Sequence, residues 1–118
     1  MAVALIANTA VTPTVSVNAQ SASYTFVLAD GNNAFVTLSN ASANTLTIPP
    51  NSSVAFPVGT VLNFAQTGAG QTTITQGAGV TITSTGATAT APKTRVQYSG
   101  ASAIQTSANN WLVMGDIV

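Results

Sequence analysis

Only four side chains of this 118-residue chain carry a charge, and they limit the chemistry it could perform. They are Asp30, Lys93, Arg95 and Asp116. The sequence contains no His and no Cys, which removes the usual general base, the thiolate nucleophile and the soft metal ligands. Charged residues make up 3% of the chain, against roughly 25% of an ordinary globular domain. We therefore expect a protein that packs and binds, with no catalytic residues, no cofactor and no metal.

One enzyme class needs little more than two carboxyl groups. A small glycosidase requires them about 5–10 Å apart, so the fold would have to bring Asp30 and Asp116 together. Asp30 stands beside Gly31, and an Asp-Gly pair is typical of turns. We therefore expect Asp30 to be a turn residue, Lys93 and Arg95 to make surface or interface contacts, and the protein not to be an enzyme.

Three further motifs could bind ligands, and each has a simpler interpretation. Gly68-Ala69-Gly70 resembles part of a phosphate loop, but no helix pattern and no Lys-Ser/Thr pair follows, so we expect a turn. Trp111 could stack on a sugar, although its place before an apolar strand favours a packed core or interface Trp with a satisfied N–H. The Thr-x-Thr pairs at 73–75 and 81–83 resemble the arrays of ice-binding solenoids, which need many more regular repeats.

The elements that must position these residues are short strands. From residue 23 onward apolar and polar residues alternate, and no window has an apolar period of 3.6. Residues 23–39 indicate a hairpin around Asp30-Gly31-Asn32-Asn33. Residues 71–83 indicate a second one around a Gly-rich turn, with Ile74, Val80 and Ile82 facing inward. Further strands are expected at 45–48, 60–66, 95–98, 101–106 and 111–114, with a short strand or loop at 54–59. This pattern predicts an all-β fold, an antiparallel β-sandwich or small barrel of about eight to ten short strands.

The composition changes near residue 23. Residues 1–22 contain no aromatic residue and no Gly. We expect an extended N-terminal arm over 1–22 and a single all-β domain over 23–118, with a disordered tail or a first strand of the core as alternatives for the arm. The candidate partner-binding residues of the arm are Val3, Leu5, Ile6, Val11, Val15 and Val17. The candidate core or interface residues of the domain are Tyr24, Phe26, Phe35, Phe56, Phe64, Ile74, Ile82 and Trp111.

The charge pattern also limits the partners. Without a basic patch to meet phosphates, nucleic acid is not expected. No segment approaches the ~20 apolar residues of a membrane span, and no basic residue precedes the apolar start as in a secretory signal. A neutral surface rich in Thr and Ala gives little protection against self-association. We therefore expect a subunit of an assembly, without nucleic-acid or membrane partners.

Several segments of residues 23–118 together resemble a β-rich virion module of tailed bacteriophages, found at the C-terminal end of tail or tail-fibre proteins. The order and spacing of the segments carry this resemblance, because no single segment is diagnostic. They are YTFVLAD (24–30), NA (40–41), TLTIP (45–49), FPVGT (56–60), QTGAGQTTI (66–74), GVTI (79–82), QY (97–98) and NNWLVMGD (109–116). The module is structural, so the resemblance implies no catalytic residues.

In this chain the module is preceded only by the arm, which implies a free-standing virion protein with its own means of attachment. The resemblance then implies a head decoration, or cement, protein that oligomerises on the capsid and stabilises it non-covalently. Its expected partners are further copies of itself, in a homo-oligomer expected to be a trimer, and the major capsid protein or other virion subunits. The expected location is the virion, on the capsid surface rather than the tail. The alternative is a tail or tail-fibre tip protein that recognises a host surface glycan.

Overall fold

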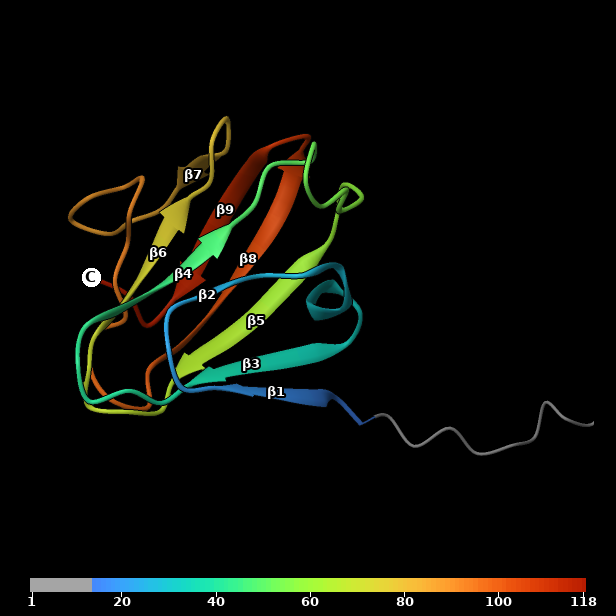
Figure 1. The fold of residues 1–118 in the computed structure, drawn as a ribbon. Helices are drawn as coiled ribbons and strands as arrows, with labels where there is room; N and C mark the ends of the chain where they lie inside the picture. The colour runs from blue at the N-terminus through green and yellow to red at the C-terminus, as the bar shows by residue number, and fades with distance from the viewer. Residues whose placement is uncertain (1–13) are drawn as a thin grey trace, which may run out of the picture.

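The computed structural model describes residues 14–118, and within this range nine strands form two sheets (Figure 1). The larger sheet has the strand order β1 (Ser16–Gln20), β3 (Ala34–Leu38), β5 (Val61–Gln66), β8 (Gly100–Ser107), β9 (Asn110–Gly115) and β7 (Thr81–Thr83). The smaller sheet has the order β2 (Tyr24–Thr25), β4 (Asn44–Ile48) and β6 (Thr72–Gln76). One short 3-10 helix, η2 (Leu28–Gly31), precedes β3. The all-β class and the number of strands expected from the sequence are confirmed.

From β1 to β6 the chain winds as a coil, and its consecutive strands alternate between the two sheets. Strands β1, β3 and β5 lie parallel in the six-stranded sheet, and β2, β4 and β6 lie parallel in the three-stranded sheet. The first turn of the coil contains β1 and β2, its second β3 and β4, and its third β5 and β6. Between the second and third turns the register is constant. Phe35 pairs with Asn63 and Ile48 pairs with Gln76, an offset of 28 residues at both ends (63 − 35 and 76 − 48). The turns of the coil therefore stack directly on one another, as solenoid repeats do.

The antiparallel arrangement expected from the sequence is wrong for most of the molecule. Among the strands of residues 14–118, two pairings are antiparallel, β5 with β8 and β8 with β9, whereas five are parallel. Both expected hairpins are wrong as well, because β2 and β3 lie in different sheets, and so do β6 and β7. A strand with one buried face alternates in the same way whether its neighbour is parallel or antiparallel, so the alternation could not distinguish the two.

The core lies between the two sheets. Ile74, Val80 and Ile82 face inward as expected, and each is less than 5% exposed. Trp111 packs edge to face against Phe56 with ring centroids 5.5 Å apart. Each large apolar side chain buried in this way contributes roughly 1.5–3 kcal/mol. The large apolar side chains of the core with 0% exposure are Phe26, Leu38, Leu46, Ile48, Leu62, Phe64 and Ile74.

Gly68-Ala69-Gly70 forms a corner between the two sheets, as its turn-like composition predicts. A Cβ atom on Gly68 would clash with the backbone of Asn40, and one on Gly70 with the backbone of Ser42. The glycines thus allow the third turn of the coil to lie directly on the second. Nearby, the buried hydroxyl of Thr72 donates to Asn44 Oδ1 at 2.6 Å, so this polar pair is satisfied inside the fold.

The segment after β7 covers the outer edge of β6. The Thr94 N–H donates to the Thr72 carbonyl at 2.9 Å, and the Ile74 N–H donates to the Pro92 carbonyl at 2.9 Å. The strand expected at residues 95–98 is absent and a turn takes its place. Tyr98 has a φ of 73° there and is 75% exposed, a backbone conformation that does not fit a strand.

Strand β1 lies inside the segment that the composition assigned to an arm. It pairs with β3 along its whole length, with Val17 opposite Phe35. The folded body therefore begins before residue 16 rather than at residue 23, and the alternative of a first core strand describes this part better. Four of the candidate arm residues lie outside the described residues: Val3, Leu5, Ile6 and Val11.

Candidate assembly surface

The outward face of the six-stranded sheet carries two rows of mainly apolar side chains. Residues paired in register on neighbouring strands point to the same face. The first row crosses five strands and consists of Val17, Phe35, Asn63, Ser102 and Met114. The second row crosses four strands and consists of Val61, Ile104, Leu112 and Thr83. We call these nine residues the outer face.

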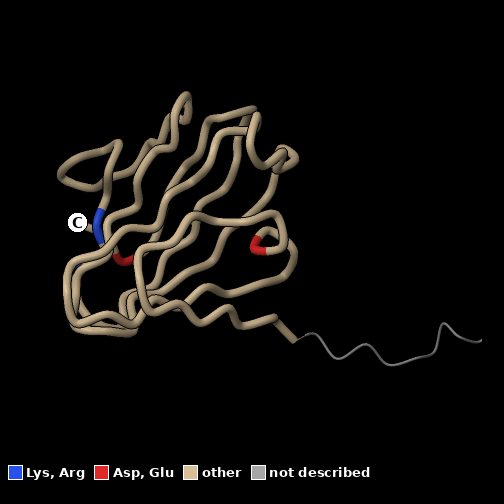
Figure 2. Tube along the Cα trace, viewed as in Figure 1, with Lys and Arg blue, Asp and Glu red and all other residues tan. Residues whose placement is uncertain are grey.

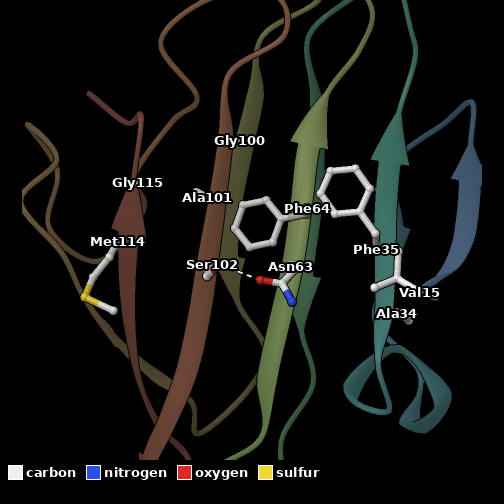
Figure 3. Close-up of a pocket in the computed structure, with 10 residues that line it drawn as sticks. All are labelled: Val15, Ala34, Phe35, Asn63, Phe64, Gly100, Ala101, Ser102, Met114 and Gly115. Carbon is white, nitrogen blue, oxygen red and sulfur yellow. Dashed lines mark hydrogen bonds between the residues drawn. The ribbon is translucent and has the colours of Figure 1, made fainter. Parts of the chain in front are cut away.

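Three of the six apolar members of the outer face, Val17, Val61 and Met114, are exposed, and the other three are partly buried. Val17 is 62% exposed and Met114 is 52% exposed, while Phe35 is half-buried. A shallow depression of about 470 Å³ lies in the first row. Figure 3 shows Phe35, Asn63, Ser102 and Met114 around it on four neighbouring strands. A partner could cover this surface without meeting a charged side chain from either row.

The two polar side chains in the middle of the first row are hydrogen-bonded to one another. The Ser102 hydroxyl donates to Asn63 Oδ1 at 2.6 Å (Figure 3). A polar group that loses water on burial is costly unless it is hydrogen-bonded. Because this pair is bonded before any partner arrives, covering the row leaves fewer polar groups unsatisfied.

Three of the four charged residues, Lys93, Arg95 and Asp116, lie on the side of the molecule where the chain ends (Figure 2), and none of them belongs to either row. Arg95 Nε donates to Asp116 Oδ1 at 2.6 Å, and Nη2 donates to Oδ2 at 2.9 Å. The Ser99 hydroxyl donates to the same carboxylate at 2.7 Å. These bonds, first from Arg95 and then from Ser99, lower the pKa of Asp116. Arg95 thus makes the surface contact that we expected, and Lys93 is exposed beside it.

Asp30 is 3% exposed and holds the first turn of the coil together. Its carboxylate accepts hydrogen bonds from the Tyr24 hydroxyl at 2.7 Å, the Val27 N–H at 2.8 Å and Asn18 Nδ2 at 2.9 Å. Burial, and then the bond to Asp30, raise the pKa of Tyr24 to about 12. Asp30 thereby links β1, β2 and η2.

The structure does not bring the two carboxylates together. Asp30 and Asp116 lie on different sides of the molecule (Figure 2) and share no hydrogen-bond partner. The carboxylate pair of a glycosidase is therefore not formed. Within residues 14–118 no group of three or more His, Cys, Asp or Glu residues is placed to hold a metal ion.

Trp111 is a core residue and offers no surface to a sugar, because it is 2% exposed. Its Nε1–H has no acceptor among the described residues, so the expected partner of this N–H is not found there. An unpaired buried donor reduces the stability that the ring contributes.

The Thr-x-Thr pairs form a different array from the expected one. Thr45 pairs in register with Thr73, and Thr47 pairs with both Thr25 and Thr75 on the outside of the three-stranded sheet. The second expected pair, 81–83, lies in the other sheet. The array spans three strands, and the hydroxyls of Thr47 and Thr75 bond to each other at 2.7 Å, so it lacks the long regular repeat of an ice-binding face.

The candidate residues from the sequence divide between the core and the outer face. Six are buried: Phe26, Phe56, Phe64, Ile74, Ile82 and Trp111. Tyr24 is partly buried against the core, Phe35 and Val17 belong to the outer face, and Val15 lies beside the depression. Sequence reasoning missed the four other apolar members of this face: Val61, Ile104, Leu112 and Met114. For Leu112 and Met114 the signal was an unbroken apolar run, Trp111 to Met114, which indicates a strand with two apolar faces.

Comparison of the chain with known protein families, with curated proteins and with solved structures finds no match. No helix in residues 14–118 is long and apolar enough to cross a bilayer. A function for this chain must therefore be inferred from its own residues and their arrangement.

Proposed function

We propose that this chain is a structural subunit of a bacteriophage virion, a head decoration protein that self-associates on the capsid and stabilises it non-covalently. The observation that carries this proposal is the outer face, a surface of mainly apolar side chains without a charge in either row. Soluble monomers rarely expose large contiguous apolar patches, and such patches mark interaction sites. The bacteriophage assignment itself rests on the resemblance of residues 23–118 to the virion module.

The chemistry of the outer face fits a protein partner. The centres of protein interfaces are depleted in charge and enriched in aromatic residues and Met, and Phe35 and Met114 are of these types. The Asn63–Ser102 pair is already hydrogen-bonded. Association through such a surface depends on apolar burial, so it should depend weakly on salt. The partners would be further copies of the chain and the major capsid protein or other virion subunits.

The first test is the number of copies in each particle, measured by quantitative mass spectrometry of purified virions of the encoding phage. A number comparable to that of the capsid subunits would support decoration of the shell. A few copies would place the protein at the tail or a vertex and favour recognition of a host glycan instead. Absence from the virion would overturn the proposal.

A second test addresses the outer face. Met114→Lys places a charge in the first row at a side chain that is already half exposed, so the fold should persist. We expect this variant to lose binding to capsids that lack the protein. Val58→Lys is the matched control, because Val58 is 63% exposed in the loop before β5 and outside both rows. Equal binding by the two variants would show that another surface contacts the capsid.

A further inference from the structure

The six-stranded sheet ends in two edge strands, β1 and β7, and the open side of β1 has no partner within residues 14–118. On its other side, the Ser16 N–H donates to the Asn33 carbonyl at 3.0 Å, and the Gln20 carbonyl accepts from the Ser39 N–H at 2.9 Å. Alternate residues of a strand in a parallel ladder bond to the same neighbour. Val17 and Ala19 therefore direct their N–H and C=O groups away from β3, toward the open side.

Strand β1 lacks the features that usually protect an edge. Natural edge strands avoid unwanted pairing through charged side chains, Pro, bulges or extreme shortness. The sequence of β1 is SVNAQ, with no charge and no Pro, and its register with β3 is unbroken over five residues. It therefore presents a regular row of free hydrogen-bonding groups to any strand of matching length.

The opposite edge is closed by the chain itself. The Thr81 N–H donates to the Asn109 carbonyl on the side of β9, so the amide of Ile82 points outward, where it donates to the side-chain oxygen of Gln76 at 2.8 Å. Strand β7 is also only three residues long. A second molecule could not extend the sheet at β7 without displacing Gln76.

We propose that β1 pairs antiparallel with β1 of a second copy about a two-fold axis, which joins two six-stranded sheets into one. A two-fold interface places each strand opposite its own copy, so any charge on the strand would meet its like, and β1 has none. With Val17 opposite Ala19 of the second copy, each such pair exchanges two hydrogen bonds. All the outward N–H and C=O groups of Val17 and Ala19 would then be satisfied.

The pairing also continues the outer face. Val17 is 62% exposed and lies in the same row as Phe35, so the second copy would cover its flank and extend the apolar row across the axis. This inference rests on the proposed function in one respect only. It identifies the contact through which the proposed self-association takes place. A ring of three copies would need β1 to meet a different edge, and β7 is capped. The edge therefore gives a two-fold pair instead of the trimer that the resemblance implied.

The test uses two variants of the full chain. Val17→Pro removes an outward N–H without touching the ladder to β3, a position that edge strands tolerate. Ala19→Lys sets two equal charges diagonally across the axis, within reach of long side chains, and covers the case in which the Pro variant does not fold. Ala43→Lys is the matched control, because Ala43 is equally small and exposed but lies in the loop before β4.

The readouts are the molar mass by light scattering over a range of concentrations and the amide exchange of Val17 and Ala19 by NMR. We expect a dimer whose two amides become protected as the concentration rises, and the same behaviour in Ala43→Lys. Because the two-fold axis repeats each change, two hydrogen bonds are lost in Val17→Pro. The dimer dissociation constant should therefore rise about tenfold or more.

Three outcomes would overturn the inference. The first is a monomer at every concentration with rapid exchange of both amides. The second is protection that does not depend on concentration and disappears on deletion of residues 2–13, which would assign the edge to the chain's own N-terminus. The third is a dimer that survives both edge variants but not Met114→Lys, which would leave the outer face as the contact. Self-pairing by a protein absent from virions would instead uphold the inference while the proposed function fails.

Discussion

At the β7 edge of the six-stranded sheet, the outward amide of Ile82 is bonded by Gln76, a side chain that comes from the other sheet. At the β1 edge, the outward amides of Val17 and Ala19 have no such neighbour in the described part of the chain. Neither edge carries a charge. The difference therefore comes from the side chains that contact each edge strand. A single amide side chain, that of Gln76, protects β7, although the sequence of β7 itself contains nothing that protects an edge.

The regions behind the two edges differ as well. Behind β7, Ile82 pairs in register with Trp111, which packs against Phe56. Behind β1, the inner contacts are polar, because Asn18 and Tyr24 donate to the buried Asp30. The closed edge is thus supported by apolar packing, and the open edge by hydrogen bonds that need defined directions.

The largest effect should come from the apolar side of this comparison. We expect Trp111→Ala to lower the free energy of unfolding by about 3–5 kcal/mol, because it empties a large buried site. Urea denaturation measures this loss. Val17→Ala, at the exposed open edge, should stay within about 0.5 kcal/mol of the wild type. Similar losses of unfolding free energy in the two variants would contradict the difference between the apolar region behind β7 and the exposed edge at β1.

The polar side should show the next largest effect. Asp30→Asn replaces an acceptor of three hydrogen bonds by a group that accepts at only one atom. We expect a loss of about 1–3 kcal/mol, since bonds to charged groups are among the stronger ones. Asp116→Asn, on the exposed ion pair, should cost less in the same denaturation experiment. A larger loss in Asp116→Asn would show that Asp30 does not hold the first turn of the coil.

A smaller effect is expected at the cap of β7. Gln76→Ala removes the acceptor of the Ile82 amide and should cost about 0.5–1.5 kcal/mol, the net value of one hydrogen bond. Hydrogen exchange of the Ile82 amide should become faster than in the wild type. Gln97→Ala removes an exposed bond to the Thr67 carbonyl and should leave that amide unchanged. Unaltered exchange in Gln76→Ala would mean that the two edges are protected alike.

The last effect concerns pH and arises only in alkaline solution. The pKa of Tyr24 is about 12 in the folded chain and 10.0 without these contacts, so its contribution to stability is fully present below pH 10. That contribution is lost as the pH rises from 10 toward 12, because ionised Tyr24 cannot donate to Asp30. When the pH is raised from below 10 to above 10, the urea midpoint of unfolding should therefore fall in the wild type and fall less in Tyr24→Phe. Equal slopes in the two proteins would contradict this role of Tyr24.

Alternation along the chain predicted the strands well, because a buried face imposes a period of two on any strand. The inward positions Leu46, Ile74 and Ile82 follow directly from it. The topology did not follow, since a Gly-rich turn between two strands fits a hairpin and a crossing between sheets equally well. A signal for the coil was nevertheless present. The segments NTLTI (44–48) and TTITQ (72–76) are similar at the offset of 28 residues, and internal repeats of this kind indicate stacked turns.

The outer face was harder to predict for a related reason. Leu112 and Met114 are as apolar as their buried neighbours Trp111 and Val113, so the sequence does not show which side of β9 faces the core. The neighbouring strands decide that, and their pairing is the part of the fold that alternation leaves open. Phe35 was found because aromatic residues in strands are usually buried or at interfaces.

Because the register between the second and third turns is constant, this part of the chain behaves as a repeat of 28 residues. Residues 34–61 form one complete repeat, which begins at β3 and ends where the next turn reaches the same place. A chain in which this repeat is duplicated would be longer by one strand in each sheet, or about 4.8 Å along the stack. Both of its ends would stay as they are. The height of the molecule can thus change without any change to the strand it offers to a partner.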